Sequence, residues 1–331
     1  MFPMFSQAAA VLTSVVLMVA AATPSTTVAQ AAFPNRPISW VVPYAAGGAT
    51  DVLVRVITRR LSDDLGQPVV VNNKPGAGTM IAAQFVATAP ADGYTMLAAV
   101  VANLVTAPLL SATPPGYDPI KDFEAVSLIT SNPLLLVASK KSEIRSFAEF
   151  LRRAKERPGQ LAIASYGQGT PSHLGIELLK STAAIDVIHV PYKGSAPALV
   201  DLLGGRVPLM MDILPSHIKT MENGDVVGLA IGQRSRSPLA PQVQTFREAG
   251  LAGFEATTWV GVVVPARTPK EVIERLNQAF QRALADPQVL QSLSSQGMPS
   301  QPSSAQEFGA MVKGDYVKWG AVIKSANIKA E

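Results

Sequence analysis

Hydrophobic positions along the chain follow two alternating patterns. Short apolar runs predict buried strands, and longer segments with an apolar residue every three or four positions predict helices. The first pair is a strand at 38–42 and a helix at 51–65, which Gly66 ends. This strand-then-helix order continues along most of the chain, and it favours a mostly parallel sheet with helices on both faces. We therefore expect an α/β fold.

The predicted elements form two α/β sets. Further strands are predicted at 69–71, 95–101, 134–138, 160–165, 187–190, 207–211, 227–231 and 259–264, and further helices from the turn at 76–78 to about 88 and at 146–157, 170–182, 196–204, 269–284, 288–296 and 305–326. The stretch 117–123 is rich in turn residues. We expect the second set to be inserted in the first, which gives one lobe from 32–130 with 256–331 and another from 131–255. The chain then passes between the two lobes twice, near residues 130 and 256. Two such connections form a hinge, and the space between hinged lobes is a natural ligand cleft.

The first 31 residues differ from the rest of the chain. Ala8–Ala22 is an apolar run as long as a signal-peptide core, and the small-x-small pattern AQA follows at 29–31. The alternative is a membrane anchor, but a spanning helix needs about 20 apolar residues. No acid or base precedes Arg36, which departs from the usual basic start of a signal peptide. The sequence predicts an exported protein with a signal peptide at 1–31 that is cleaved near Ala31.

The composition excludes several kinds of site. The chain has 331 residues, 48% of them hydrophobic, and no cysteine. Disulfides, zinc–thiolate sites and cysteine nucleophiles are therefore excluded. The net charge is +4, and the Lys and Arg residues are scattered without a basic stripe interleaved with aromatic residues. We therefore expect no nucleic-acid partner, and no motif indicates a cofactor.

Small residues fill the turn between the first predicted strand and its helix. The stretch VVPYAAGGATD, at 41–51, leaves almost bare backbone where the helix begins. In an open parallel sheet, ligands lie beyond the carboxyl ends of the strands, and a helix start binds anions through its unpaired N–H groups. The alternative is a tight turn that needs glycine for its backbone angles. The candidate ligand-binding residues of this turn are Tyr44, Ala46, Gly47, Gly48, Ala49, Thr50 and Asp51.

A second turn of the same kind follows the strand predicted at 160–165. The stretch ASYGQGTPSH, at 164–173, has Thr170 as an expected N-cap and Pro171 at the first helical position. Neither turn contains Lys or Arg, so recognition would rest on backbone N–H groups and hydroxyls. Two such helix starts, one in each lobe, would suit a small ligand with two acidic ends, or with one acidic and one polar end. The candidates here are Ser165, Gly167, Gly169, Thr170 and His173.

Four polar side chains near the predicted cleft each have two possible roles. Asp51 could interact with the helix dipole, or it could orient the turn or pair with a ligand amine. His173 is expected to fix its turn by a local hydrogen bond rather than to contact the ligand. Asn103 and Asp212 stand at strand ends, where each could face the cleft or be a plain turn residue. Both remain candidate ligand-binding residues.

Motifs for catalysis are weak or missing. The stretch VVVNNKPGAGTMI has a G-x-G turn after a strand, but Ile81 stands where a dinucleotide-binding motif needs its third glycine. The sequence has no G-x-S-x-G elbow and no phosphate-binding loop. The three histidines, His173, His189 and His217, show no close metal-binding spacing. We expect a binding protein, and an exported α/β enzyme is the less favoured alternative.

Seven stretches carry a family resemblance when they are taken in order. They are PNRPISWVVPYAAGGATD, NNKPGAGTMIAA, ADGYTML, YDPIKDFEAV, ASYGQGTPSHL, VPYKGSAPALVDLLGGRV and WVGVVVPARTP. Together they cover nearly the whole predicted mature chain, and the chain resembles the Bug family of bacterial periplasmic solute-binding proteins, the extracytoplasmic receptors of tripartite tricarboxylate transporters. The resemblance implies a two-lobed periplasmic-binding-protein fold of type II that closes on a small carboxylate in the periplasm. It also implies that the two turns grip the carboxylate through main-chain N–H groups, hydroxyls and water.

The chain departs from the family pattern at two places. Ala45 and Ala46 stand where the family commonly has prolines, and the stretch AAVVAN at 98–103 is more apolar than is common there. An apolar wall suits an aromatic or aliphatic acid better than a citrate-like one. The expected ligand is a dicarboxylate, an acidic amino acid or an aromatic acid, and the expected partners of this monomer are membrane transporter subunits. A receptor for a membrane sensor kinase would have the same sequence features and remains an alternative.

Overall fold

The strands of the chain form one mixed sheet. The computed structural model describes Met1 and residues 33–328, so the predicted signal peptide lies, except for Met1, outside the described residues. Within the described part, nine strands pair in the order β2-β1-β3-β9-β4-β7-β5-β6, with β8 beside β4. They are β1 (Ile38–Val42), β2 (Val69–Asn73), β3 (Thr95–Val100), β4 (Phe123–Ser139), β5 (Ala162–Ser165), β6 (Ile188–Pro191), β7 (Leu209–Ile213), β8 (Val226–Ile231) and β9 (Thr257–Pro265). The predicted α/β class is confirmed.

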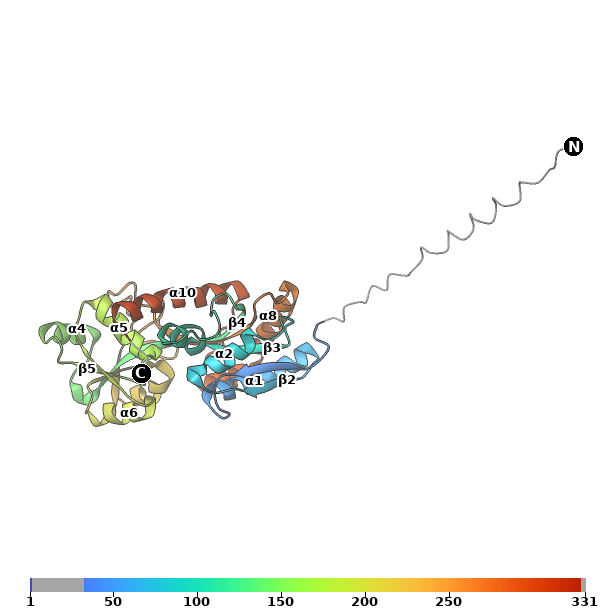
Figure 1. Ribbon diagram of the computed structural model, residues 1–331. Helices are drawn as coiled ribbons and strands as arrows, with labels where there is room; N and C mark the ends of the chain where they lie inside the picture. The colour runs from blue at the N-terminus through green and yellow to red at the C-terminus, as the bar shows by residue number, and fades with distance from the viewer. Residues whose placement is uncertain (2–32, 329–331) are drawn as a thin grey trace.

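Helices gather at both ends of this sheet. They are α1 (Ala49–Leu65), α2 (Met80–Ala87), α3 (Ala107–Leu110), α4 (Phe147–Glu156), α5 (Pro171–Ala183), α6 (Ser195–Gly204), α7 (Ile218–Glu222), α8 (Lys270–Ala285), α9 (Pro287–Ser295) and α10 (Ala305–Ser325), with short helical turns η1 (Ala77–Thr79), η2 (Ala102–Thr106), η3 (Lys140–Ser142) and η4 (Leu214–His217). Helices α1, α2 and α8 lie at one end of the molecule, α4, α5 and α6 lie at the other, and α10 extends along both (Figure 1). No helix within residues 33–328 combines the length and the hydropathy that a membrane span needs.

The outer strands run parallel, and the central strands do not. Strand β1 pairs in parallel with β2 and β3, and β5 pairs in parallel with β6 and β7. Strands β4 and β9 run antiparallel to each other and to their other neighbours. The prediction of a mostly parallel sheet is therefore wrong at the centre. The reason is that β4 and β9 carry the chain between the two ends of the molecule in opposite directions, which makes them antiparallel.

Strand β4 is much longer than the sequence pattern predicts. It begins at Phe123 rather than Leu134, and its first half contains the polar residues Glu124, Ser127 and Thr130. These residues interrupt the apolar run that marks a buried strand. The backbone of this half pairs with β9 along its length, so tertiary pairing rather than local pattern determines where the strand starts.

Three backbone segments meet where the chain passes between the ends. Leu134 N–H donates to Ala256 O over 2.9 Å, Ala256 N–H donates to Gly232 O over 2.9 Å, and Gly232 N–H donates to Leu134 O over 2.8 Å. A side chain at Gly232 would lie 2.5 Å from Ala256 O, so only glycine fits there. We propose that this crossing lies at the boundary of two lobes, with residues 32–130 and 256–331 as the first lobe and residues 131–255 as the second lobe.

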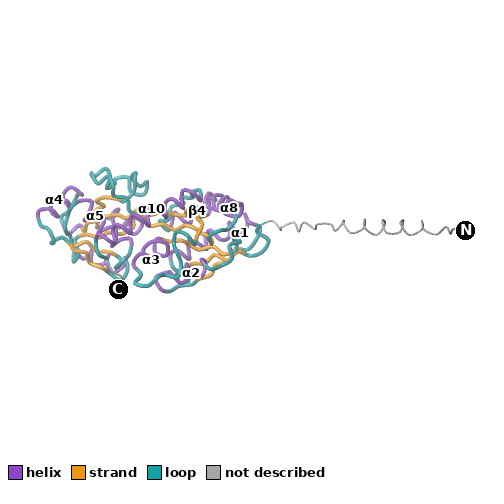
Figure 2. The backbone as a smooth tube through the Cα atoms, turned by 45° about the horizontal axis from the view of Figure 1, so that its top comes forward, coloured by secondary structure: helices purple, strands orange, loops and turns teal. Residues whose placement is uncertain are grey.

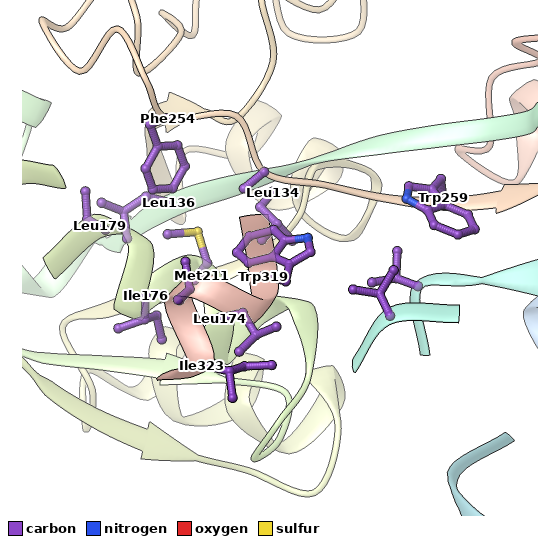
Figure 3. Close-up of a cluster of buried hydrophobic side chains, with 14 of the residues drawn as sticks. Leu134, Leu136, Leu174, Ile176, Leu179, Met211, Phe254, Trp259, Trp319 and Ile323 are labelled. Carbon is purple, nitrogen blue, oxygen red and sulfur yellow. The ribbon is translucent and has the colours of Figure 1, made fainter. Parts of the chain in front are cut away.

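Helix α10 packs on elements of both proposed lobes. Its first half places Phe308 edge-on against Trp259 of β9, with ring centroids 5.3 Å apart. Its second half places Trp319 and Ile323 in a buried cluster with Leu174 of α5, which Figure 3 shows. Figure 2 shows α10 between the end that carries α4 and α5 and the end that carries α1 and α8. One helix therefore contacts the structure on both sides of the crossing.

Candidate functional site

A cavity lies between the two proposed lobes. Its volume is about 460 Å³. The lining comes from Tyr44 and Thr50 beside α1, Gly78 of η1, Val100–Ala102 with Thr106, Ala107 and Leu110, Tyr166 and Gln168–Pro171 beside α5, and Thr258–Val260 of β9. None of these lining residues is Asp, Glu, Lys or Arg. A side chain at Gly169 would lie 2.7 Å from Leu110 Cδ1, so α3 approaches the second-lobe turn closely across the cavity.

The residues predicted to bind a ligand fall into three groups in the structure. Four of them line the cavity: Tyr44, Thr50, Gly169 and Thr170. Three line a smaller hollow of about 320 Å³, which shares Tyr44 and Thr50 with the cavity: Ala46, Gly48 and Ala49. The other seven line neither space: Gly47, Asp51, Asn103, Ser165, Gly167, His173 and Asp212.

The start of α1 presents free backbone donors beside these two spaces. Gly48 is the N-cap and offers no side-chain cap. Within residues 33–328, the N–H groups of Ala49, Thr50 and Asp51 have no hydrogen-bond acceptor. A helix start with unpaired N–H groups carries about half a positive charge and favours an anion. Gly47 has a φ of 84°, a left-handed angle that glycine adopts without strain.

The Asp51 side chain fixes the conformation of the turn before α1. Its side chain is almost fully buried, and Oδ2 accepts from Gly47 N–H over 2.8 Å and from Arg55 Nε over 2.9 Å. Its Oδ1 accepts from Asn73 Nδ2 over 2.9 Å. The hydrogen bond from Arg55, with smaller contributions from Gly47 and Asn73, lowers the pKa of Asp51 to about 2 against the opposing effect of burial. Both carboxylate oxygens are thus engaged, and Asp51 orients the turn.

The start of α5 uses most of its donors within the protein. Pro171 at the first helical position has no N–H, and the Thr170 hydroxyl accepts from His173 N–H over 3.5 Å. Gly169 N–H donates to His173 Nδ1 over 3.1 Å. The local hydrogen bond expected for His173 is therefore present. Fewer backbone donors remain here for a ligand than at α1.

Two stacked imidazoles support this second turn. The rings of His173 and His189 lie 3.9 Å apart between centroids and 10° from parallel. His189 Nε2 is 2.7 Å from Ser165 Oγ, and Ser165 Oγ accepts from Gly167 N–H. Burial is the first cause that lowers the pKa of both histidines to about 4; the neighbouring His173 lowers the pKa of His189 further, and Lys180 makes a smaller contribution at both. Both rings are therefore neutral near pH 7, and each contacts the turn through a hydrogen bond.

Asn103 and Asp212 have internal hydrogen-bond partners. Asn103 Oδ1 accepts from Val100 N–H over 2.9 Å, and its Nδ2 donates to Ala98 O over 3.1 Å. Asp212 Oδ1 accepts from Ser195 Oγ and from Ile213 N–H, and its Oδ2 lies 3.2 Å from His217 Nε2. Each side chain thus fixes the backbone at the end of its strand. Within residues 33–328, no group of three or more His, Cys, Asp or Glu side chains could hold a metal ion.

Sequence reasoning missed much of the cavity wall. Thr106 and Leu110 belong to η2, a π-helical turn, and to α3, and local periodicity does not predict either element. Tyr166 lies inside the turn at 164–173; burial raises the pKa of its hydroxyl, so it stays protonated and can donate to an acid. Trp259 lines the cavity from β9. The apolar residues expected at 98–103 do contribute to the wall through Val100, Val101 and Ala102.

Three comparisons agree on what the chain is similar to. Residues 53–328 match the model of the tripartite tricarboxylate transporter family receptor. Protein BugT of Bordetella pertussis is 36% identical over 90% of this chain and 91% of its own. The R. palustris protein Rpa4515 with adipate is 36% identical, with a TM-score of 0.72 over 90% of this chain and 99% of its own. MatC of Rhodopseudomonas palustris with bound malate is 33% identical, with a TM-score of 0.69 over 88% of this chain and 100% of its own.

Proposed function

We propose that the chain captures a small carboxylate between its two lobes and delivers it to a membrane transporter. It belongs to the tripartite tricarboxylate transporter receptor family of periplasmic solute-binding proteins. The two-lobed fold of the solved relatives accounts for a cavity that both lobes line. The proposed working form is a monomer in the periplasm, after cleavage of the signal peptide near Ala31.

The observation that carries the proposal is the free helix start at the edge of an uncharged cavity. The N–H groups of Ala49, Thr50 and Asp51 have no acceptor within residues 33–328, and no cavity-lining side chain is charged. A hydrogen bond to a charged group contributes roughly 1.5–3 kcal/mol. Three such bonds contribute roughly 4.5–9 kcal/mol, and the hydroxyls of Thr50 and Tyr166 can add to this; micromolar binding corresponds to about −8 kcal/mol.

The apolar part of the cavity wall supports an apolar body for the ligand. Val100, Val101, Leu110, Trp259 and Val260 form this part of the wall. A citrate-like acid would place hydroxyl and carboxylate groups against these side chains, where they would lose hydrogen bonds to water. We propose an aliphatic or aromatic acid whose carboxylate meets the α1 start. The adipate bound by one relative has such a chain, whereas the malate bound by another is shorter and more polar.

Thermal unfolding of the mature protein, freed of bound solute, tests this function. The panel would hold adipate, malate, benzoate and citrate, each raised to millimolar concentration. A ligand at 100 times its dissociation constant adds about 2.7 kcal/mol to the free energy of unfolding. We expect adipate or benzoate to raise the melting temperature more than citrate does. If citrate gave the largest shift, the apolar ligand class would be wrong, and if no acid gave a shift, the carboxylate assignment itself would fail.

A further inference from the structure

A second cavity lies entirely within the first proposed lobe. Its volume is about 540 Å³, compared with about 460 Å³ for the cavity between the lobes. It lies between the start of β4, the start of α8 and the first half of α10, and α8 lies beside α10 at this end of the molecule (Figure 1). Sites for small molecules have volumes of about 300–1,000 Å³, so this space is large enough for one. We call it the outer cavity.

The floor of the outer cavity is apolar and reaches the hydrophobic core. Four of its lining side chains are at most 8% exposed: Leu104, Phe123, Val263 and Val312. Ile120 and Ile273 are partly buried and extend this floor. An apolar ligand body that lies against these side chains is removed from water, and this removal favours binding.

Three lysines from three different elements line the same cavity. Lys121 lies in the turn before β4, Lys270 is the first residue of α8, and Lys313 lies on α10. Within residues 33–328, Glu124 is the one acidic residue of the lining. Among the same described residues, the cavity between the lobes has no charged lining residue. The outer cavity therefore differs from it by combining an apolar floor with a mostly cationic lining.

The ammonium groups of these lysines are available to a ligand. Lys121 Nζ lies 3.3 Å from Asp118 Oδ2, and Lys270 Nζ lies 3.6 Å from Glu274 Oε1. The two lysine side chains are 82% and 89% exposed, and exposed ion pairs of this kind contribute little to stability. Lys313 is exposed and forms no salt bridge within the described part of the chain. A better placed anion can therefore take these contacts at small cost.

We infer that the outer cavity binds a single-chain amphipathic anion, of which a medium-chain fatty acid is the simplest case. The alkyl chain lies against the apolar floor, and the carboxylate meets the lysines, whose long side chains keep their charged ends in water. The inference goes beyond the proposed function, because it concerns a second site, built by one lobe alone, for an acid with a longer apolar body.

Isothermal titration calorimetry of the mature protein with decanoate, below the concentration at which it forms micelles, tests the inference. Two other probes separate the contributions of chain and charge. Decyltrimethylammonium has the same chain and the opposite charge, and butyrate has the same head and a short chain. We expect saturable decanoate binding that is at least about tenfold tighter than the binding of either other probe, because each lacks one of the two interactions.

A variant that fills the outer cavity locates the binding. Gly309 of α10 lines the cavity, and a Cβ added there would lie 3.5 Å from Ala125 Cβ, which is an ordinary contact. Gly309→Leu therefore places a side chain in the cavity without a clash at Cβ, and it should remove saturable decanoate binding. Thr50→Asp changes the start of α1 in the other cavity, and it should leave decanoate binding at the parental affinity.

A second set of variants tests the lysines. Lys121→Gln, Lys270→Gln and Lys313→Gln together should weaken decanoate binding by about tenfold, since each exposed charge contributes modestly. The matched control removes the same charge from three exposed lysines that do not line the outer cavity, by Lys155→Gln, Lys219→Gln and Lys324→Gln. The control should bind decanoate as the parent protein does. If Gly309→Leu fails to fold, this pair of triple variants retains the test.

Four results would overturn the inference. The first is the absence of saturable decanoate binding, and the second is binding that survives Gly309→Leu but is lost in Thr50→Asp, which would place the chain in the cavity between the lobes. The third is equal binding by the two triple variants. The fourth is binding to phosphatidylglycerol vesicles without binding of free decanoate. The test uses none of the acids of the thermal-unfolding panel, so a failure of that panel would contradict the proposed function alone.

Discussion

The two helix starts beside the cavity look alike in sequence and differ in the use of their N–H groups. At α1 the cap is a glycine, the turn is exposed, and three consecutive N–H groups have no acceptor within residues 33–328. At α5 a proline removes one donor, Thr170 caps another, and Gly169 N–H donates to His173. The α1 turn therefore has N–H groups available for a ligand, whereas much of the donor capacity of the α5 turn is already used within the protein.

The difference shows how one structural motif can serve two purposes. An exposed N–H group without an acceptor in the protein is available to an anionic ligand, and a paired one holds the backbone in a fixed position. The α1 turn is kept open by a carboxylate underneath it, Asp51. The α5 turn is kept rigid by the stacked rings of His173 and His189. We expect the acid group of the ligand at α1, with α5 completing the enclosure.

The strongest test of this comparison places the same charge at each helix start. We expect Thr50→Asp to weaken acid binding by at least about 100-fold, because its carboxylate would compete for two or more N–H groups that each contribute roughly 1.5–3 kcal/mol. Thr170→Asp should weaken binding by about tenfold or less. Isothermal titration calorimetry with adipate or benzoate, whichever gives the larger thermal shift, measures both.

A third aspartate controls for the general effect of charge. Ser146→Asp replaces the N-cap of α4, whose hydroxyl accepts from Glu149 N–H over 3.1 Å, and Asp is an equally good cap. This variant should bind the acid as the parent protein does. If Thr50→Asp and Thr170→Asp weakened binding equally, both helix starts would hold acid groups, and the distinction between them would be wrong.

The two turns should contribute to the loss of stability in acid over separate pH ranges. Above pH 6.5 the rings of His173 and His189 are neutral in both the folded and the unfolded chain. Between pH 6.5 and about 4 the unfolded chain takes up protons that the folded chain does not, since the folded pKa of both rings is about 4, so stability falls as pH falls. A shift of this size corresponds to about 3 kcal/mol for His173. Urea unfolding at a series of pH values measures the decline.

Variants at each turn test which residue causes the loss of stability in each pH range. His173→Phe keeps a flat ring in the stack, and it should remove much of the decline between pH 6.5 and 4. Asp51 has a pKa of about 2 against an ordinary value of 3.8, so its contribution to stability is lost only as pH falls below 3.8. Asp51→Asn should therefore remove the part of the pH dependence that lies below 3.8, and it should lower stability by a constant amount above that pH. A His173→Phe protein with the full parental decline would show that the stacked rings do not titrate as described.

The sequence predicts the elements of this fold better than it predicts the cavity. The apolar runs at 38–42 and 227–231 mark strands within a residue, because burial on both faces leaves a local signal. The first half of β4 leaves none, since pairing with β9 rather than local pattern holds it. Trp259 reads as one more apolar residue of a strand, and only the fold places it between the cavity and Asp315.

The single candidate residues show the same difference between what the sequence predicts and what only the fold determines. Small residues before a helix correctly indicate an accessible turn at α1, because bare backbone is visible in the sequence itself. Whether N–H groups are free is not visible there, because it depends on acceptors such as His173 Nδ1 and the Thr170 hydroxyl that reach back along the chain. Asp212 stands at a strand end that could face the cleft, yet its oxygens contact Ser195, Ile213 and His217.

The smallest expected effect concerns the orientation of the α1 turn. Asp51→Asn keeps one oxygen that can accept from Gly47 N–H, but it removes the charge that holds Arg55. The turn should then sample other conformations, and we expect acid affinity to fall about tenfold, or about 1.4 kcal/mol. Asp201→Asn breaks a similar carboxylate–arginine pair at α6, with Arg206, and should leave affinity unchanged. An Asp51→Asn protein with parental affinity would mean that the glycines alone shape the turn, and the two helix starts would then differ in their donors but not in what holds them.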